Sequence, residues 1–564
     1  MANGNDPANI PYIIVDNGFY YVAYKEKAKV PEVVVSAKGV ANGLSEDYND
    51  GWDFGPDSYD PDSTASIPYT QTSGIQEAVT YIASNGGGEI EVVTGEYIVN
   101  TTISILSSHI HIHGKGTIIP SSSFSGNAYG DVFVINVDEA GFLEDISIDG
   151  LKFDFKNLPS DSSINVNGIH VKYTNATTAT EYYNIRITNI SGFNLPSNST
   201  TYYANNALVY VTATNTGPTR PQGVIINNVF AYNSYCIIQT AGTSGVTISN
   251  VTGVDLTGNG IMIGYGNYVD NSINFGPDTT SALVNINLGN AEYALPFDSS
   301  NNTYAGLYIN ASAFTVSNVI VGGFGTGILA QNPENEGECV ISNAVVMENS
   351  GQGITLLGNS DTYIHPITLM GVTSYGNGFG TGGSTGESGS GLVTYGASFK
   401  AIGCMITGNN GYGLYVANDN NVEITGFVDK FTDFGTENPN GAGAYFVDSF
   451  FAGSPNMIIE GTGFTNSPTI SANPPVSATV YQNTLPYDIE IDLPVYATTS
   501  GTAGYVTVAK GSSSSSLTTI GNQFVNGSTS STSVDIIRLR VPAGWYYEFT
   551  ASGVTFGTAS VFAE

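Results

Sequence analysis

Aromatic and acidic side chains gather in the longer insertions that interrupt an otherwise regular sequence. These insertions follow Asn189, Asn290, Gly371 and Gly426. Aromatic rings can lie against sugar faces, and carboxylates and amides can bond sugar hydroxyls, so this mixture predicts a glycan-binding site; the alternative is that the rings pin the insertions to the rest of the protein. The candidate glycan-binding residues are Tyr202, Tyr203, Tyr293, Phe297, Asp298, Tyr304, Tyr375, Phe379, Glu387, Phe427, Asp429, Phe431 and Asp433.

Hydrolysis of a glycosidic bond requires two carboxyl groups about 5–5.5 Å or about 6.5–9.5 Å apart. Asp255 and Glu348 each stand five residues after an asparagine of the repeat described below, so they should share one column. Counting repeats places them about three coils apart, which is about 14 Å at a spacing of about 4.8 Å. That separation is too long for either mechanism, so we predict no catalytic residue from this pair.

Three histidines share one strand-like segment, where His109, His111 and His113 alternate with isoleucines. Neighbours on the same face of a strand lie about 6.6 Å apart, close enough for two imidazoles to share a metal ion. The alternative is a face that contacts solvent or a partner, and its charge would respond to pH. We favour this alternative and predict neither a metal site nor a cofactor.

The elements that carry these residues repeat along the chain. Segments 246–250, 314–318 and 339–343 all read apolar-x-apolar-x-Asn, and a Gly-x-Gly-Ile segment follows each of them. Self-similarity with a period of about 20–50 residues indicates a solenoid. Because the unit reads as strand, bend and strand, we predict a parallel β-helix whose neighbouring coils share stability and whose interrupting loops carry function.

The asparagines of the repeat form a column. The residues two and four positions earlier are mostly apolar, as Ile185 and Ile187 are before Asn189. Since strand side chains alternate between faces, we expect the column to point into the core, where stacked amides bond one another. Cys236, Cys339 and Cys404 should also be small core residues, because their spacing fits neither disulfides nor zinc. The column is Asn189, Asn228, Asn250, Asn290, Asn318, Asn343, Gly371, Cys404 and Gly426.

The pattern divides the chain into four parts. Residues 1–43 contain a hairpin signal at Asn17-Gly18, followed by Lys25, Lys27 and Lys29; they form either a docking module or an edge hairpin protected by lysines. Residues 44–70 are an acidic linker, for which a calcium site is the alternative reading. Residues 71–475 carry the β-helix, and the short alternating strands of residues 476–564 predict an antiparallel β-sandwich.

Ahead of the repeats, Ile75, Val79 and Ile82 recur at helical spacing, and Asn85 and three glycines follow. This order, continued by strands near residues 89–113, resembles the start of pectate-lyase-like β-helix proteins, including many phage tailspikes. The stretch 57–78 is similar to β-helix proteins of archaea and their viruses. The resemblance covers roughly residues 57–470. It implies an all-β fold: a right-handed, single-stranded parallel β-helix with an N-terminal capping helix and outward-facing histidines.

The same resemblance implies that the C-terminal β-sandwich mediates trimerisation or glycan contact. It does not extend to the chemistry of two related enzyme classes. Polyuronate lyases use an Arg or Lys base with calcium, and galacturonases use a Gly-His-Gly element. This chain has no Gly-His-Gly and no Lys or Arg between Arg220 and Lys400.

Composition excludes several ligand classes. Charged residues make up 11% of the chain and its net charge is −33. Nucleic acids and anionic lipids are bound through Lys and Arg, so neither is expected, nor is a strongly acidic polysaccharide. No apolar run approaches the ~20 residues of a membrane span, and no secretory signal is visible, so we expect no membrane insertion. Sequons that would suit an extracellular glycoprotein are Asn100, Asn175, Asn189, Asn198, Asn250, Asn301, Asn310 and Asn526.

These observations lead to one hypothesis and two alternatives. We expect a virion-surface or extracellular appendage of the tail-fibre or spike type, similar to those of archaeal viruses. It would be a homo-oligomer, with a trimer favoured, that binds a host cell-surface glycan and docks on other virion proteins through its N-terminal module. The alternatives are a carboxylate-dependent glycan depolymerase on the same scaffold and a purely structural coat or filament subunit.

Overall fold

In the computed structural model the chain forms two compact units, which we call unit 1 (Met1–Ala231 with Asn267–Asn274) and unit 2 (Tyr232–Gly266 with Phe275–Glu564). The structure describes residues 11–16, 19–24, 32–36, 54, 70–126, 130–159, 165–173, 181–196, 206–213, 223–264, 281–289, 304–331, 337–358, 366–378, 387–417, 421–425, 432–433, 436–437, 443–447, 456–460, 469–472, 474–483, 488–498, 504–525 and 535–563.

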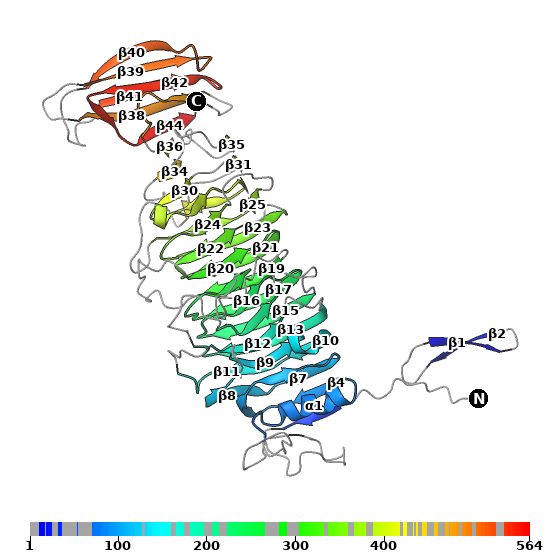
Figure 1. Ribbon diagram of the computed structural model, residues 1–564. Coiled ribbons are helices and arrows are strands. Elements are labelled where there is room, and N and C mark those ends of the chain that lie inside the picture. The colour runs from blue at the N-terminus through cyan, green and yellow to red at the C-terminus, as the bar shows by residue number, and fades with distance from the viewer. Residues whose placement is uncertain are drawn as a thin grey trace. The chain divides into compact units, whose positions relative to one another are not determined.

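Unit 1 consists of short strands that pair in parallel with the equivalent strand of the next coil (Figure 1). The first row is β3 (Glu32–Val35), β4 (Gly88–Val92), β7 (Ile110–Gly114), β10 (Phe142–Asp149) and β13 (Glu181–Phe193), with β15 (Val224–Tyr232) later in the chain. The second row is β5 (Glu96–Thr101), β8 (Thr117–Ser125) and β11 (Lys152–Asp154). The third row is β6 (Ile103–Ile105), β9 (Asp131–Asn136), β12 (Asn167–Lys172) and β14 (Val209–Thr212).

The N-terminal helix covers the first coils because one of its faces is apolar. Helix α1 (Ile75–Ser84) buries Ile75, Val79 and Ile82 and packs against β3, β4 and β6. The predicted capping helix is therefore confirmed. A second short helix is α2 (Val137–Ala140), and β1 (Pro11–Asp16) forms an antiparallel hairpin with β2 (Phe19–Tyr24). Among the described residues, no helix is long and apolar enough to cross a membrane.

Unit 2 continues the same architecture and ends in antiparallel sheets. Its first row is β17 (Val246–Val254), β19 (Ser281–Gly289), β21 (Phe314–Gly322), β23 (Cys339–Met347), β25 (Ile367–Met370) with β26 (Thr373–Tyr375), β28 (Phe399–Ile402) with β29 (Met405–Thr407), β31 (Asn421–Thr425) and β35 (Asn456–Glu460). Its second row is β16 (Ile238–Ala241), β18 (Ile261–Ile263), β20 (Ala305–Asn310), β22 (Thr326–Gln331), β24 (Ile354–Leu357), β27 (Leu392–Tyr395), β30 (Tyr412–Ala417), β34 (Gly443–Val447) and β36 (Thr469–Ala472).

The C-terminal strands form two antiparallel sheets. One contains β38 (Ile489–Ala497), β41 (Asp535–Val541), β43 (Val554–Phe556) and β44 (Ala559–Ala563), and β44 also pairs with β36. The other contains β37 (Val480–Gln482), β42 (Tyr546–Ser552), β39 (Gly504–Gly511) and β40 (Thr518–Val525). Short elements elsewhere are the 3-10 helix η1 (Glu387–Gly389) and the strands β32 (Thr432–Asp433) and β33 (Thr436–Glu437). The parallel β-helix with C-terminal antiparallel sheets is thus confirmed.

Five coils of unit 2 whose corners are described turn at two residues with positive φ, five positions apart. Asn, Asp and Gly tolerate this left-handed conformation better than other residues do, which explains their recurrence at these corners. The pairs are Asn250 and Asp255, Asn318 and Gly323, Asn343 and Glu348, Gly371 and Gly376, and Gly403 and Gly408. We call the two sets the first and second corner columns.

The prediction that the asparagine column points into the core is wrong. Asn250, Asn318 and Asn343 are exposed, as are Asn189 and Asn228 in unit 1. A positive φ breaks the alternation of the strand, so the asparagine faces outward and the next residue, such as Val251, returns to the core. Asn285 occupies the place expected for Asn290, which lies outside the described residues together with Gly426, and Cys404 is buried beside the corner residue Gly403.

The exposed asparagines still bond one another along the coils. In unit 2 each Nδ2 donates to the Oδ1 of the preceding coil, from Asn285 to Asn250 at 3.0 Å and from Asn318 to Asn285 at 3.2 Å. In unit 1, Asn228 donates to Asn189, which donates to Asp149. The amide stacking that we predicted therefore exists, but on the outer surface.

A second asparagine ladder lies inside unit 2. Asn349, Asn377 and Asn409 are fully buried one residue after the second corner column. Asn349 donates to the Oδ1 of Asn377 at 2.8 Å, and Asn377 donates to the Oδ1 of Asn409 at 2.7 Å. Each Oδ1 also accepts a backbone N–H, which satisfies polar groups that the turn would otherwise leave buried and unpaired.

Unit 1 contains a different buried polar network. Asp131 accepts hydrogen bonds from Asn167 and contacts His170 at 2.9 Å, and the other ring nitrogen of His170 lies 2.9 Å from the Thr212 hydroxyl. All four side chains are fully buried, and Tyr210 stacks on the imidazole. Because these residues come from β9, β12 and β14, the network ties three successive coils together.

The cysteines are core residues, as predicted. Cys236, Cys339 and Cys404 are buried and free. Burial raises the pKa of the thiols of Cys236 and Cys339 to about 12, so both stay protonated and unreactive near neutral pH.

Replacing Asn377 with alanine should lower the free energy of unfolding by about 1–3 kcal/mol, because it leaves buried partners of the inner ladder unsatisfied. The matched control is Asn318→Gly, which removes an exposed amide but keeps a residue that tolerates positive φ; it should cost less than about 0.5–1 kcal/mol. Denaturant unfolding of the two variants measures the difference. Equal losses of unfolding free energy in the two variants would show that the buried ladder stabilises the fold no more than the exposed one does.

Candidate functional site on the outer sheet faces

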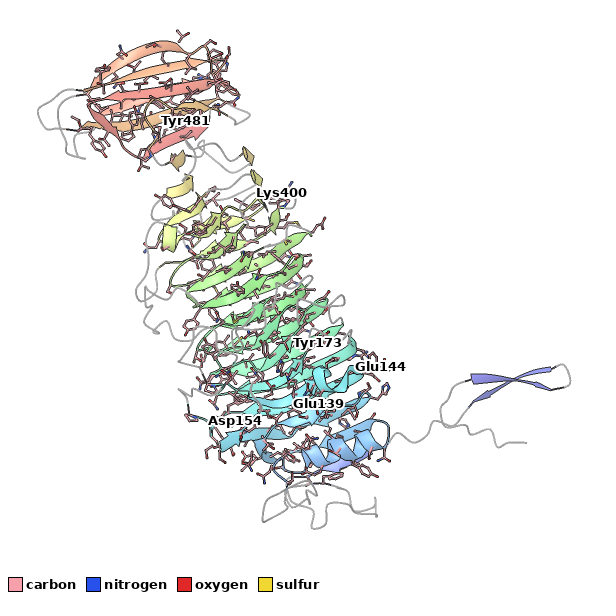
Figure 2. The ribbon with its side chains drawn as sticks, viewed as in Figure 1. Glu139, Glu144, Asp154, Tyr173, Lys400 and Tyr481 are labelled. Atoms are coloured by element: carbon pink, nitrogen blue, oxygen red, sulfur yellow. The ribbon has the colours of Figure 1, made fainter. Side chains whose placement is uncertain are left out.

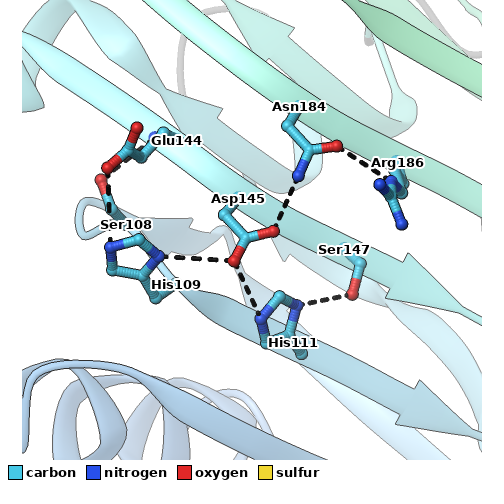
Figure 3. A network of polar contacts seen from close by, with 8 residues as sticks. All are labelled: Ser108, His109, His111, Glu144, Asp145, Ser147, Asn184 and Arg186. Atoms are coloured by element: carbon cyan, nitrogen blue, oxygen red, sulfur yellow. Dashed lines mark hydrogen bonds and ion pairs between the residues drawn. The ribbon is translucent and has the colours of Figure 1, made fainter. Parts of the chain in front are cut away.

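The predicted histidine strand lies on the outer face of unit 1, where His109 and His111 meet carboxylates of the next coil (Figure 3). The Nδ1 of His109 and the Nε2 of His111 lie 3.4 and 3.6 Å from the same Oδ2 of Asp145. Glu144 lies 3.6 Å from the Nε2 of His109. The histidines face outward, as the resemblance implied. His109, just before β7, and His111 on β7 contact β10, whereas the Nε2 of His113 lies 3.9 Å from Glu89 on β4.

The network extends to β13, where Asn184 donates to the other oxygen of Asp145 at 2.8 Å and accepts from the Nε of Arg186 at 2.9 Å. These side chains are about half exposed, and ion pairs at such sites contribute only about 0–1 kcal/mol. Within the described ranges, no three His, Cys, Asp or Glu side chains are arranged to hold a metal ion. The network itself is polar, and Phe142 at the start of β10 is an exposed aromatic ring beside it in sequence, 46% exposed.

Unit 2 presents a different surface, between its two corner columns. We call this surface the outer strip. It has an inner row, Thr252, Asn287, Ile320, Val345 and Thr373, and an outer row, Val254, Gly289, Gly322, Met347 and Tyr375. The asparagine ladder borders the inner row, and the second corner column, with Asp255 and Glu348, borders the outer row.

Apolar groups in and beside the outer strip reach the solvent. Val254 is 39% exposed, Ile320 is 41% exposed, and Tyr232 at the end of β15 is 42% exposed. The Tyr375 hydroxyl donates to the sulfur of Met347 at 2.9 Å. Exposed apolar side chains bordered by amides and carboxylates are the combination that binds sugars, whose rings have an apolar face and a rim of hydroxyls.

The charge of this surface is negative throughout. Asp255 and Glu348 stand on its border, and the sequence has no Lys or Arg between Arg220 and Lys400. In the described coils of unit 2, Lys400 on β28 is the one basic residue, and Figure 2 labels it. The outer strip therefore offers acceptors for hydroxyl groups but no cation for a phosphate, sulfate or uronate.

Tyr232 and Asp255 illustrate how the border is built. Asn233 donates its backbone N–H to the carbonyl oxygen of Val254, which brings the two segments side by side. The pKa of the Tyr232 hydroxyl is raised above its ordinary value, first by its hydrogen bond to the Asp255 carboxylate and then by the charge of that group. The pair is a hydroxyl and a carboxylate held together at the surface.

The predicted site residues fall into three groups. Outside the described residues lie Tyr202, Tyr203, Tyr293, Phe297, Asp298, Phe379, Phe427, Asp429 and Phe431. Glu387 lies in η1 and Asp433 in β32, where only the backbone is described. The side chains of Tyr304 and Tyr375 are described, but they are three coils apart, about 14 Å along the stack.

Tyr304 and Tyr375 also differ in their surroundings. The ring of Tyr304 packs edge-on against Tyr235, with centroids 6.0 Å apart, so it holds a turn in place. Tyr375 belongs to the outer strip. Insertions 290–303 and 379–386 each join a first-row strand of unit 2 to the following second-row strand, and insertion 197–205 joins β13 of the first row to β14 of the third row in unit 1. Segments 214–222, 265–280 and 359–365 fall in the other connection of their coils.

The spacing predicted for the two column carboxylates is confirmed. Asp255 and Glu348 both lie in the second corner column, separated by the steps from β17 to β19, β21 and β23. At about 4.8 Å a step they are too distant to act on one glycosidic bond. The sequence analysis did not name Tyr232, Val254 and Met347 as surface residues of this strip. Each stands one residue before a second corner, and this signal could be used only once the corners were known.

No known protein-family model matches this sequence, and no curated protein matches it. Solved structures are similar in fold. The enzymatically active domain of tailspike protein 2 of bacteriophage CBA120 is 13% identical, with 99% of this chain and 79% of that chain covered and a TM-score of 0.40. The tailspike of Escherichia coli bacteriophage HK620, solved with a hexasaccharide, is 15% identical, with 87% and 88% covered and a TM-score of 0.34.

A carbohydrate enzyme is also similar. The A-module of mannuronan C-5 epimerase AlgE6 from Azotobacter vinelandii is 12% identical, with 72% of this chain and 94% of that chain covered and a TM-score of 0.35. The expected resemblance to tailspikes and β-helix carbohydrate enzymes is confirmed at the level of the fold. What this chain binds has to be argued from its own surface.

Replacing Asp255 with asparagine should lower the pKa of Tyr232, because the neutral amide no longer favours the protonated hydroxyl. Alkaline titration of tyrosinate absorbance, taken as the difference between each protein and its Tyr232→Phe counterpart, measures this pKa. Glu348→Gln is the control, since that carboxylate belongs to the same column three coils away and should leave Tyr232 unchanged. Equal shifts in both variants would contradict the pairing.

Proposed function

We propose that the protein is a virion-surface appendage of the tailspike type that binds a glycan of the host cell. The observation that carries this proposal is the outer strip, where solvent-exposed apolar groups lie between an amide ladder and a column with carboxylates. The strip is built on first-row strands of a continuous ladder, so its side chains are held in fixed positions. Such rigidity lowers the entropy that is lost when a ligand binds.

The charge of the chain disfavours nucleic acids and anionic membrane lipids as partners. A chain with net charge −33 repels nucleic acid and anionic lipid headgroups. The same charge disfavours acidic polysaccharides, whereas a glycan with free hydroxyls can donate hydrogen bonds to Asp255, Glu348 and the asparagine ladder. The nine candidates outside the described residues, among them Phe297 and Asp429, remain predictions from the sequence.

The proposal favours binding over hydrolysis. The distance along the stack between Asp255 and Glu348 rules out this pair as a glycosidase pair. Of the other carboxylates proposed for the insertions, Asp298 and Asp429 lie outside the described residues. We therefore keep glycan recognition as the function and name no catalytic residue.

The appendage would use its ends for assembly. The N-terminal hairpin, with the lysines that follow it, would dock on other virion proteins. The C-terminal antiparallel sheets would hold copies together.

Purified full-length protein should bind a subset of an oligosaccharide array and the isolated envelope of its host. Carbohydrate removal from the envelope by periodate oxidation should abolish the binding, because hydroxyl-bearing sugars are the expected ligands. A borohydride-reduced mock treatment without periodate is the control. Binding to neither the array nor the envelope would end the proposal.

Light scattering should report an assembly of about three times 59.1 kDa at micromolar concentration. A variant truncated before residue 476 should be smaller, because it lacks the C-terminal sheets. A full-length protein that stays at the monomer mass would contradict the assembly part of the proposal and leave glycan binding untouched.

A further inference from the structure

Two glycines interrupt the outer row of the strip on neighbouring coils. The register pairs Gly289 with Gly322 and Gly322 with Met347, and Val254 stands one coil before Gly289. Outer-row side chains therefore project from Val254 and from Met347, and the Met347 side chain lies over Gly322, with its Cγ 3.3 Å from the place where a Cβ of Gly322 would stand. We call the interval from Val254 to Met347, which has room for a side chain at Gly289, the glycine gap; at about 4.8 Å per coil, the flanking residues are about 14 Å apart along the stack.

A positive φ does not explain the two glycines. Gly289 and Gly322 are absent from the residues with positive φ, unlike Gly323 and Gly376 in the adjacent corner column. A Cβ built on Gly289 would meet only the carbonyl oxygen of Gly253, at 3.9 Å, which is an ordinary contact. A Cβ on Gly322 would stand 3.0 Å from the carbonyl oxygen of Met347, so packing accounts for Gly322 but not for Gly289. Glycine in a strand costs stability, about 0.5–1 kcal/mol relative to alanine, and it often marks a site that a ligand approaches closely.

The two sides of the gap carry matching chemistry. On one side stand Val254 and Tyr232, with the Tyr232 hydroxyl bonded to Asp255. On the other side stand Met347 and Tyr375, which bond each other. The corner column repeats the arrangement, because Asp255 and Glu348 flank Gly323. Each side therefore offers an apolar group and a carboxylate, and between them lie the backbone of Gly289 and the Met347 side chain over Gly322.

The negative charge around the gap favours an uncharged ligand. Asp255 and Glu348 are the charged groups of the described surface around the gap, and no Lys or Arg occurs between residues 220 and 400. An anionic sugar would be repelled there with no cation to compensate. A hydroxyl donating to a carboxylate makes a charge-assisted hydrogen bond, and the thioether and tyrosine rings suit the apolar face of a sugar ring.

We propose that the glycine gap seats uncharged sugar residues of a glycan that runs across neighbouring coils of unit 2. Asp255 and Glu348 accept its hydroxyl hydrogens, and Tyr232, Val254, Met347 and Tyr375 contact its ring faces. This inference rests on the proposed glycan-binding function and adds the place of binding and the class of sugar.

The test fills the gap without disturbing the backbone. Gly289→Phe places a ring in the gap, and Gly521→Phe is its matched control, because a Cβ on Gly521 in β40 would also meet no clash. Glu348→Gln removes one acceptor charge. Binding is measured on an array of neutral hexose and N-acetylhexosamine oligosaccharides together with uronate-bearing and sulfated ones, and denaturant unfolding of each variant is recorded.

The wild-type protein should bind neutral oligosaccharides. Gly289→Phe and Glu348→Gln should each weaken this binding about tenfold or more, the loss expected for one hydrogen bond to a charged group or one blocked ring contact. Gly521→Phe should bind as the wild type does.

Four results would overturn the inference. Undiminished neutral-glycan binding by Gly289→Phe, or a preference of the wild type for uronate-bearing or sulfated glycans, would remove the gap as the site and leave the proposed function standing. A much greater loss of stability in Gly289→Phe than in Gly521→Phe would show that the glycine serves packing of the chain itself. Binding to no glycan at all would remove the inference and the proposed function together.

Discussion

Parallel pairing between successive coils is the constraint on which the rest of this protein depends. Each first-row strand bonds the equivalent strand of the next coil, so every coil must repeat the backbone path of its neighbour. The path contains corners at positive φ, and each corner recurs at the same place in the next coil. The repeat of asparagine and glycine in the sequence is the consequence, because these residues accept that conformation at low cost.

Polar ladders then fix the register of the coils. An outer ladder of amides follows the first corner column, and an inner ladder from Asn349 to Asn409 follows the second. In unit 1, the buried Asp131, His170 and Thr212 connect three coils in the same way. A buried polar group without its partner is costly, so a slipped register would leave several such groups unsatisfied at once. The ladders therefore select one alignment of strands that apolar packing alone would not distinguish.

Because strand pairing and the corners fix the backbone path, the outward side chains between the corners can differ from one coil to the next. Unit 1 uses this freedom for imidazoles and carboxylates that bond across strands, such as His111 with Asp145. Unit 2 uses it for exposed apolar groups, glycines and carboxylates, with no basic residue from Arg220 to Lys400. This contrast is the reason that we propose the sugar-binding surface on unit 2, on paired strands as well as on the insertions named from the sequence.

The sequence by itself determined the period, the class of fold, the capping helix, the buried cysteines and the spacing of Asp255 and Glu348, because these depend on counting repeats and on apolar alternation. Only the tertiary structure decided which way the asparagines face and that Asn285, not Asn290, continues their column. Alternation predicts a side chain's face only while φ stays negative, and asparagine permits a positive φ without requiring it. Likewise, Gly289 and Gly322 are far apart in the chain, and they form one gap only because the hydrogen bonds between coils align them.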